Sequence, residues 1–298
     1  MNMIPSRILI PLLGFSAAAH AAVLVNESFT GYTGTDLFGN AATGLGLTGN
    51  WSGSGFFKNQ ATSLSMTGVA NQGGSLALNL VTTSGKQASV ELSAPLPTTT
   101  LYGSYLFNTT LAASNARTVG GIGVGSPGDN DNSASFVWSG NGYNSSNGIE
   151  GPNLRAEGSG TPLPTVSLVD GQTYVMLFEF SATAQTTSAW VLNEAQLGNF
   201  YGSLDAATLN AAATDTEAAT GVAWRGTATG GAVGSMSSLL LFGYTPNASG
   251  DIVYQWDEIR ISDTSLLESV SVPEPSVLSL ASGLGLLAIR RRRRHGLH

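Results

Sequence analysis

The chain has 298 residues, of which 10% are charged, 42% are hydrophobic and 38 are glycine. Long solvent-facing helices need many Glu and Lys residues, so this composition excludes a helical bundle, and its apolar content excludes disorder driven by charge. Between Ala22 and Val272 the sequence holds 18 acidic and six basic residues, a difference of −12. An acidic body of this kind repels phosphate backbones and excludes nucleic acid as a partner.

Several residue types that carry chemistry are missing from the body. Cysteine is absent, which excludes disulfides, thiol nucleophiles and Cys-ligated metals. The three histidines, His20, His295 and His298, all lie near the ends, which removes Ser-His catalysis and His-ligated zinc from the body. Its two lysines, Lys58 and Lys86, do not follow a serine at the spacing of a Ser-Lys dyad.

The first 21 residues have the pattern of a secretory signal peptide. Arg7 precedes the apolar run Ile8–Phe15, and Ala19-His20-Ala21 provides the small residues, Ala19 and Ala21, after which a signal peptidase cuts. The sequence therefore predicts export, with signal peptidase as a transient partner.

Residues 22–271 show no linker or break in composition and are predicted to form one domain. Short apolar or alternating runs, rich in β-branched and aromatic residues, are separated by turn residues, which favours an all-β antiparallel β-sandwich. The segment 204–219 is Ala-rich and is predicted to hold one short helix or a long loop. The predicted strands are Leu76–Val81, Ala88–Leu92, Leu101–Asn108, Val119–Val124, Ser133–Trp138, Thr173–Ala182, Thr187–Asn193, Ser237–Tyr244 and Ile252–Ser262.

Aromatic residues in polar, glycine-rich segments are the candidates for binding carbohydrate. Sugars are held by aromatic platforms together with polar groups on loops. Trp138, Asn141 and Tyr143 lie together in one such segment, and Trp51 lies in another. Trp224-Arg225 in a third segment is a weaker candidate, and Trp190 and Trp256, inside predicted strands, are weaker still. The competing interpretation is that each tryptophan packs in the core.

One segment has the oxygen ligands of a calcium site. Asp129 and Asp131 alternate with asparagines before Ser133, as in the first half of a calcium-binding loop. Ala134 stands where an EF-hand needs glycine, and Gly140 stands where it needs its bidentate glutamate. The alternatives are a calcium site of another type and an ordinary solvated turn.

Catalysis of glycan cleavage needs two carboxylates on one face of a strand. Asp257 and Glu258 are adjacent in a predicted strand, so regular alternation directs them to opposite faces. Arg260 and Ser262 occupy the positions where a second carboxylate would be needed, and Arg260 is expected to pair with a local carboxylate or to lie at the sheet edge. We therefore assign no catalytic residues and expect no enzymatic activity.

Four segments of the body resemble concanavalin A-like (LamG-type) jelly rolls. Thr173–Phe180 with Ser188–Asn193 is similar to their paired strands, Tyr254–Ser262 to their closing strand, and Asn26–Phe29 to the strand that pairs with it. The resemblance implies a jelly-roll sandwich. That fold hosts lectins, glucanases and adhesion modules, so it does not by itself define a function.

The C-terminus combines an apolar run with a cluster of arginines. A helix over residues 276–289 would be about 21 Å long at about 1.5 Å per residue, short of a bilayer core of about 30 Å. Directly after it come five arginines, Arg290, Arg291, Arg292, Arg293 and Arg294, which have the character of a cytoplasmic stop signal. Bilayer thinning and snorkelling arginines absorb the mismatch, so a C-terminal transmembrane helix is predicted.

Residues 272–298 resemble the PEP-CTERM sorting signal of Gram-negative bacteria. Pro273, Glu274 and Pro275 match its signature, and the hydrophobic and arginine parts follow in order. The resemblance implies transient anchoring in the inner membrane and processing by an exosortase, followed by delivery to the cell surface or an exopolysaccharide or biofilm matrix. The sequence as a whole thus predicts an exported, non-catalytic surface or matrix protein. The alternatives are a lectin-like module that binds polysaccharide and a glycan hydrolase.

Overall fold

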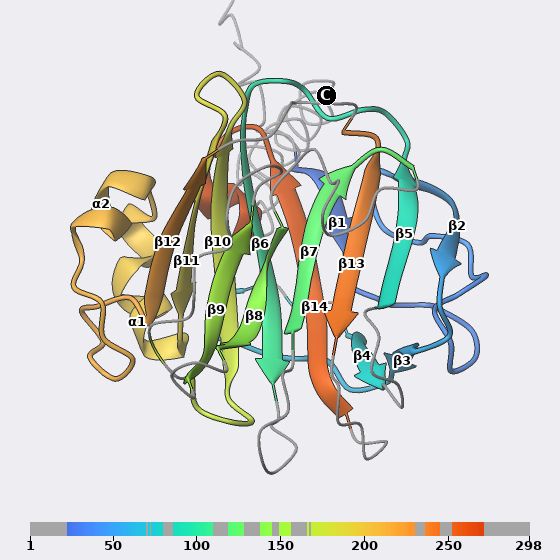
Figure 1. The fold of residues 1–298 in the computed structure, drawn as a ribbon, viewed down its shortest axis with the longest axis horizontal. Coiled ribbons are helices and arrows are strands. Elements are labelled where there is room, and N and C mark those ends of the chain that lie inside the picture. Colours follow the sequence, from blue (N-terminus) through green and yellow to red (C-terminus); the bar gives the residue numbers. More distant parts are fainter. Residues whose placement is uncertain are drawn as a thin grey trace, which may run out of the picture.

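The computed structural model describes residues 23–69, 71, 73–79, 86–109, 119–127, 138–144, 149–155, 166, 168–229, 236–244 and 252–270. These residues form two antiparallel sheets that pack face to face, with short helices at one side (Figure 1). The predicted all-β antiparallel sandwich is confirmed.

The eight-stranded sheet has β14 near its centre. Its strand order is β12-β11-β10-β6-β14-β4-β3, and β1 pairs with the part of β14 beyond β4. Its strands are β1 (Val23–Glu27), β3 (Phe57–Gln60), β4 (Ser75–Asn79), β6 (Thr100–Thr109), β10 (Thr173–Ser181), β11 (Thr186–Leu192), β12 (Trp224–Thr229) and β14 (Ile252–Ser262).

The six-stranded sheet lies in front of the other in the view of Figure 1. Its strand order is β2-β5-β13-β7-β8-β9. Because strands that follow one another in the sequence often belong to different sheets, the chain crosses between the two sheets several times. Its strands are β2 (Leu47–Gly53), β5 (Lys86–Leu92), β7 (Val119–Gly125), β8 (Trp138–Asn144), β9 (Ile149–Arg155) and β13 (Ser238–Tyr244).

Strand β10 shows why the eight-stranded sheet is covered on both faces. Tyr174, Met176 and Phe178 enter the core between the sheets, and the alternate residues Val175 and Leu177 enter a second core on the outer face. An almost uninterrupted apolar run is what a strand buried on both sides requires. The sandwich therefore has two apolar layers, one on each side of this sheet.

Four short helices contribute to the cover of the outer face. They are α1 (Glu194–Phe200), the single 3₁₀ turn η1 (Tyr201–Ser203), α2 (Ala206–Ala211) and α3 (Leu266–Val270). Asn193 and Gln196 form a capping box at the start of α1, with each side chain accepting from the other residue's backbone N–H at 2.9–3.0 Å. Leu197, Leu209 and Leu266 then pack into the second core.

Most predicted strands are found within one or two residues of their predicted ends. The two strands predicted to pair are β10 and β11, and they do pair, with Phe178 opposite Ala189. The closing strand, β14, pairs with β1 as predicted, with Glu27 opposite Ile259. The predicted strand Ser133–Trp138 is wrong at its described end, because β8 begins at Trp138. Strands β2, β3, β9 and β12 and helices α1 and α3 were not predicted, and α2 lies inside the Ala-rich segment.

The predicted terminal segments lie outside the described residues. These are the signal peptide with its cleavage residues Ala19 and Ala21, the Pro-Glu-Pro signature, the apolar run 276–289 and the arginine cluster. Within the described part of the chain, no helix is both long and apolar enough to span a bilayer.

Candidate functional site

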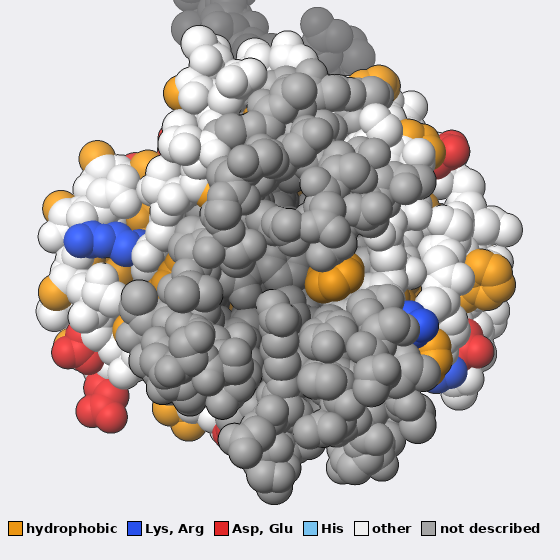
Figure 2. Space-filling model, viewed as in Figure 1, with side chains coloured by type: hydrophobic (Ala, Val, Ile, Leu, Met, Phe, Trp, Pro, Cys, Tyr) orange, Lys and Arg blue, Asp and Glu red, His pale blue; other side chains and the backbone are white. Residues whose placement is uncertain are grey.

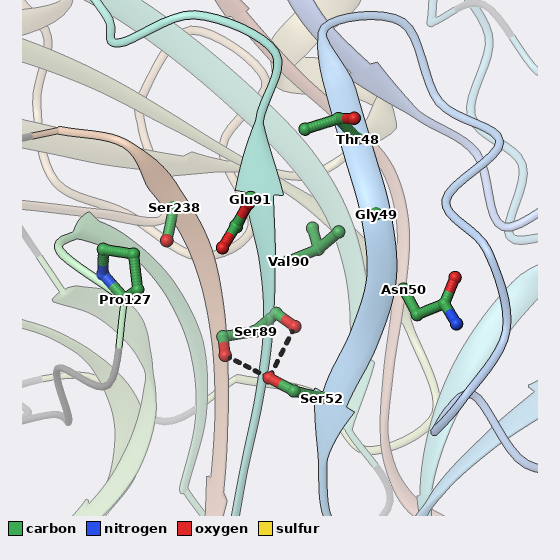
Figure 3. Close-up of a pocket in the computed structure, with 9 residues that line it drawn as sticks. All are labelled: Thr48, Gly49, Asn50, Ser52, Ser89, Val90, Glu91, Pro127 and Ser238. Carbon is green, nitrogen blue, oxygen red and sulfur yellow. Dashed lines mark hydrogen bonds between the residues drawn. The ribbon is translucent and has the colours of Figure 1, made fainter.

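A polar cleft lies on the outer face of the six-stranded sheet. Along β5, Ala88, Val90 and Leu92 enter the core, so Ser89 and Glu91 alternate with them on the outer side. The cleft has a volume of about 240 Å³ and is lined by Thr48, Gly49, Asn50, Ser52, Ser89, Val90, Glu91, Pro127 and Ser238 (Figure 3).

The cleft exists because β2 bends away from β5. Thr48 pairs with Glu91 and Ser52 with Ser89. Between these two pairs β2 contains two more residues than β5, which makes a β-bulge in β2. The bulged residues turn to another partner: the N–H of Trp51 donates to the carbonyl of Asn40 at 2.9 Å. Gly49, within the bulge, has a φ of +73°, a conformation that glycine adopts without strain.

The groups in the cleft suit hydrogen bonding to a polyol. Figure 3 shows the side chains of Thr48, Ser52, Ser89 and Glu91 between β2 and β13, while the Asn50 amide lies on the other side of β2. The hydroxyls of Ser52 and Ser89 are 2.8 Å apart and hydrogen-bonded. Hydroxyls both donate and accept, and the carboxylate accepts, so together they match the alternating donors and acceptors of sugar hydroxyls.

The size and charge of the cleft limit what it takes. Its volume of about 240 Å³ is below the usual range of about 300–1,000 Å³ for ligand pockets. Among the described residues that line it, Glu91 is the single charged group, and it is exposed to solvent. In the same view as Figure 1, the charged side chains of described residues that can be seen lie toward the two sides of the molecule, and residues outside the described ranges cover much of its middle (Figure 2). The described part of the cleft is therefore small, polar and acidic.

The structure corrects the prediction for Trp51. Its side chain is 1% exposed and belongs to the core between the sheets, with its ring 6.3 Å from that of Phe29. Its Nε1–H donates to the Tyr32 hydroxyl at 2.8 Å. The prediction of Trp51 as a sugar-stacking platform is therefore wrong, since neither face of the indole is open. Its backbone, however, forms part of the bulge that opens the cleft.

The other predicted sugar-binding residues lie in a strand instead of a loop. Trp138, Asn141 and Tyr143 belong to β8, where Asn141 pairs with Gly120 of β7. β8 is three strands from β5 in the same sheet, about 14 Å at the usual strand spacing. The side chains of β8 are outside the described part of the structure, so their role in binding stays a prediction.

The weaker tryptophan candidates are all buried. Trp224 is 2% exposed at the start of β12, which corrects its predicted place in a loop, and Trp190 and Trp256 are fully buried. The predicted calcium residues Asp129 and Asp131 lie outside the described residues. Within the ranges that are described, no group of three or more His, Asp or Glu side chains is placed to hold a metal ion.

A buried charged cluster surrounds the bulge in β14. Glu27, Asp257 and Glu258 are fully buried, and Arg260 is 1% exposed. The pairing with β6 shifts between Asp257 and Arg260, and Glu258 has a φ of +50°. The regular alternation predicted for this strand is therefore wrong at these residues.

Arg260 pairs with a local carboxylate, as the sequence predicted. Its Nη2 lies 3.0 Å from Oε2 of Glu258, and both side chains are buried.

Asp257 fastens the loop between β3 and β4. Its Oδ2 accepts from the Ser63 hydroxyl at 2.6 Å and from the Leu64 N–H at 2.8 Å, and its Oδ1 accepts from the Glu258 N–H at 2.8 Å. Burial raises the pKa of Asp257 to about 7; its hydrogen bond from Ser63 opposes this rise, and the neighbouring Glu258 adds to it.

Glu27 is held in the same way on the other side of the sheet. Its Oε1 accepts from the Phe29 N–H at 2.6 Å and its Oε2 from the Tyr32 hydroxyl at 2.5 Å. Burial raises the pKa of Glu27, while these hydrogen bonds lower it. These buried carboxylates stabilise loops from within, and because none of them reaches solvent they do not contact a dissolved substrate.

Comparisons with known proteins describe architecture at low similarity. Neither a family model nor a curated protein matches the sequence. Lectin II from Ulex europaeus aligns with a TM-score of 0.42 and 8% identity over 71% of this chain and 91% of its own. Peanut lectin with a nonapeptide aligns with a TM-score of 0.38 and 11% identity, over 72% of this chain and 98% of its own. The globular domain of T. cruzi calreticulin aligns with a TM-score of 0.43 and 12% identity, over 81% of this chain and 95% of its own. Values this low say nothing about what the present chain binds.

Sequence reasoning missed the cleft entirely. Its serines and threonine are spread over β2, β5 and β13, and hydroxyl residues on the outer face of a sheet look like ordinary solvent-facing positions. The one local signal is the run Thr48-Gly49-Asn50-Trp51-Ser52-Gly53, where two glycines flank a tryptophan and indicate a bulge.

Proposed function

We propose that the sandwich is a non-catalytic module that binds a neutral polysaccharide through the cleft between β2, β5 and β13. The observation that carries this proposal is the cleft itself, in which hydroxyls and one carboxylate gather at a strand bulge. Shallow, hydroxyl-lined sites recognise sugars by hydrogen bonds, and repeated units along a polymer raise the avidity of a weak single site.

The charge of the domain supports a neutral ligand. The body carries 18 acidic and six basic residues, and one of the acidic residues, Glu91, lies at the cleft. An acidic polysaccharide would meet repulsion both from the whole domain and from this group. A neutral polymer meets neither, and its hydroxyls are able to donate to Glu91.

The alternative of a glycan hydrolase is less well supported. A retaining enzyme needs two carboxyl groups about 5–5.5 Å apart, and an inverting enzyme needs them about 6.5–9.5 Å apart, on either side of the substrate. Of the described residues that line the cleft, one carries a carboxylate, Glu91. The acids of β14, Asp257 and Glu258, belong to the other sheet and are buried, and Asp257 is hydrogen-bonded to the loop between β3 and β4.

Export and sorting are proposed from the terminal sequences. A signal peptidase would cut after Ala21, and an exosortase would process the chain near Pro273-Glu274-Pro275, placing the domain at the cell surface or in an extracellular matrix. Mass spectrometry of the surface protein should find a C-terminus that lacks Arg290–Arg294. An intact C-terminus in a host that has an exosortase would contradict processing.

A glycan array tests the binding proposal. The purified protein should bind neutral polysaccharides and leave uronic acid polymers unbound at the same concentration and ionic strength. No binding to any glycan at high protein concentration would contradict the proposed function. Release of reducing sugar from a β-glucan panel would contradict its non-catalytic part.

A further inference from the structure

Helix α3 fixes the end of the domain to the outer face of the eight-stranded sheet. Leu266 and Val270 are buried in the second core, the one on that outer face. The Ser104 hydroxyl of β6 donates to the carbonyl of Ser269, and Nη1 of Arg260 donates to the carbonyl of Val270 at 3.1 Å. The chain therefore leaves the domain from a fixed point on this face.

The guanidinium that holds Val270 is itself held from two further sides. Nε of Arg260 donates to Oδ1 of Asn26 in β1 at 3.2 Å, and Nη2 donates to Glu258 at 3.0 Å. A buried arginine with three directed hydrogen-bond partners has little freedom to move. The attachment of α3 is therefore part of the core and is not a fraying end of the chain.

The cleft lies on the opposite side of the sandwich. It opens on the outer face of the six-stranded sheet, whereas α3 contacts β6, β14 and β10 of the other sheet. Figure 1 shows β5, β13 and β7 in front, with the red helix α3 behind the strands. Two packed sheets, about 10 Å apart, lie between the two sites.

The segment that joins α3 to the predicted membrane helix is short. From Val270 to Ser276 there are six residue steps, which span at most about 21 Å even when fully extended. A compact domain of about 250 residues has a radius of gyration of about 18 Å and hence a diameter of about 45 Å. The tether is thus less than half the width of the domain, which limits how far the domain is able to roll on a membrane.

We propose that, while the chain is anchored, the α3 face of the sandwich is directed toward the bilayer and the cleft faces away from it. This inference rests on the proposed membrane anchor at residues 276–289. The geometry presents the cleft to polymers in the surrounding matrix before the chain is released. It also makes the α3 face, with the exposed residues Asp263 and Thr264, the surface nearest to the lipid headgroups.

The cysteine-free sequence allows a direct test. Thr264→Cys places a single thiol beside α3, and Ser52→Cys places one at the cleft; both positions are exposed. Each full-length variant is labelled with a fluorescent donor and reconstituted into phosphatidylcholine vesicles that carry acceptor-labelled headgroups. We expect strong energy transfer from the label at position 264 and a loss of most of that transfer at position 52.

A longer tether is the matched control. Inserting about 40 Gly/Ser residues after Val270 gives a linker with a root-mean-square length of about 35 Å, which should bring the transfer from the two labels together. Equal transfer from both sites with the native tether, or stronger transfer from position 52, would overturn the orientation. A chain that does not float with the vesicles would overturn the proposed anchor, whereas the glycan array tests the cleft independently.

Discussion

Replacing Asp257 with asparagine tests how the buried charge cluster sets the stability of the sandwich. The asparagine side chain keeps an oxygen that is able to accept from Ser63 and Leu64, but it carries no charge. Asp257 has a pKa of about 7 in the folded protein, against 3.8 as its ordinary value, because it is buried beside Glu258. The folded state therefore favours the protonated carboxyl.

The sign and size of the effect follow from proton linkage. Below pH 3.8 both the folded and the unfolded states carry the proton, and the contribution of Asp257 to stability is fully present. Between pH 3.8 and 7 only the unfolded state ionises, so the free energy of unfolding falls as the pH rises. A shift of about three pH units corresponds to a loss of about 4 kcal/mol, which is complete above pH 7.

Urea unfolding at pH 4.5, 6 and 8 measures this loss. The stability of Asp257→Asn relative to wild type should rise across the series and level off above pH 7. Subtracting the wild-type curve removes the contribution of Glu27, whose raised pKa acts in the same direction.

Glu194→Gln is the control. Glu194 is exposed, and hydrogen bonds from Thr67 lower its pKa, so its contribution to stability is lost only as the pH falls below about 4.5 and its difference curve should stay nearly flat from pH 4.5 to 8. A flat difference curve for Asp257→Asn between pH 4.5 and 8 would refute the reasoning.

Three further predictions concern core packing, helix propensity and a buried charge. Gly103→Ala should cost on the order of 1–3 kcal/mol, because a Cβ there would lie 2.0 Å from the ring of Phe178. Gly198→Ala in α1, where no atom lies within 4 Å, should instead stabilise the protein by roughly 0.5–1 kcal/mol, and thermal unfolding distinguishes the two. Arg260→Leu should cost about 3–5 kcal/mol, because it leaves Glu258 buried without its cation. A double variant that removes the charges of both Arg260 and Glu258 should recover part of that loss. If the losses in unfolding free energy of the two single variants, measured by chemical denaturation, simply add in the double variant, the pairing is contradicted.

The strands that were predicted well are those whose pattern of apolar and polar residues follows from which of their faces are buried. β14 was predicted with its observed ends, Ile252 and Ser262, and β10 was found because its apolar run is unbroken. Strands β2 and β3 were missed because their residues are mostly polar or glycine. α1 was missed although Asn193 and Gln196 form a capping box, a signal that the sequence does contain.

The candidate site was harder to predict than the fold. Aromatic residues indicated sugar binding, but the tryptophan at position 51 packs in the core, and the cleft beside it is lined by hydroxyls. The faces of Asp257 and Glu258 were predicted from regular alternation, which the bulge in β14 breaks. Both errors have the same origin, because a bulge depends on pairing with a second strand and leaves little trace in the local residue pattern.

Titration calorimetry on hydroxyl-deleted variants tests the binding account most directly. The full-length protein is titrated with the neutral oligosaccharide that gives the strongest array signal. The variant Ser52→Ala/Ser89→Ala removes the hydroxyl pair of the cleft, and Ser188→Ala/Thr227→Ala removes a comparable pair, 3.2 Å apart, on the other sheet. Loss of two hydrogen bonds should weaken binding by about tenfold or more in the first variant and leave the second unchanged. Equal affinity in both variants and the wild type would contradict the assignment of the cleft as the glycan site.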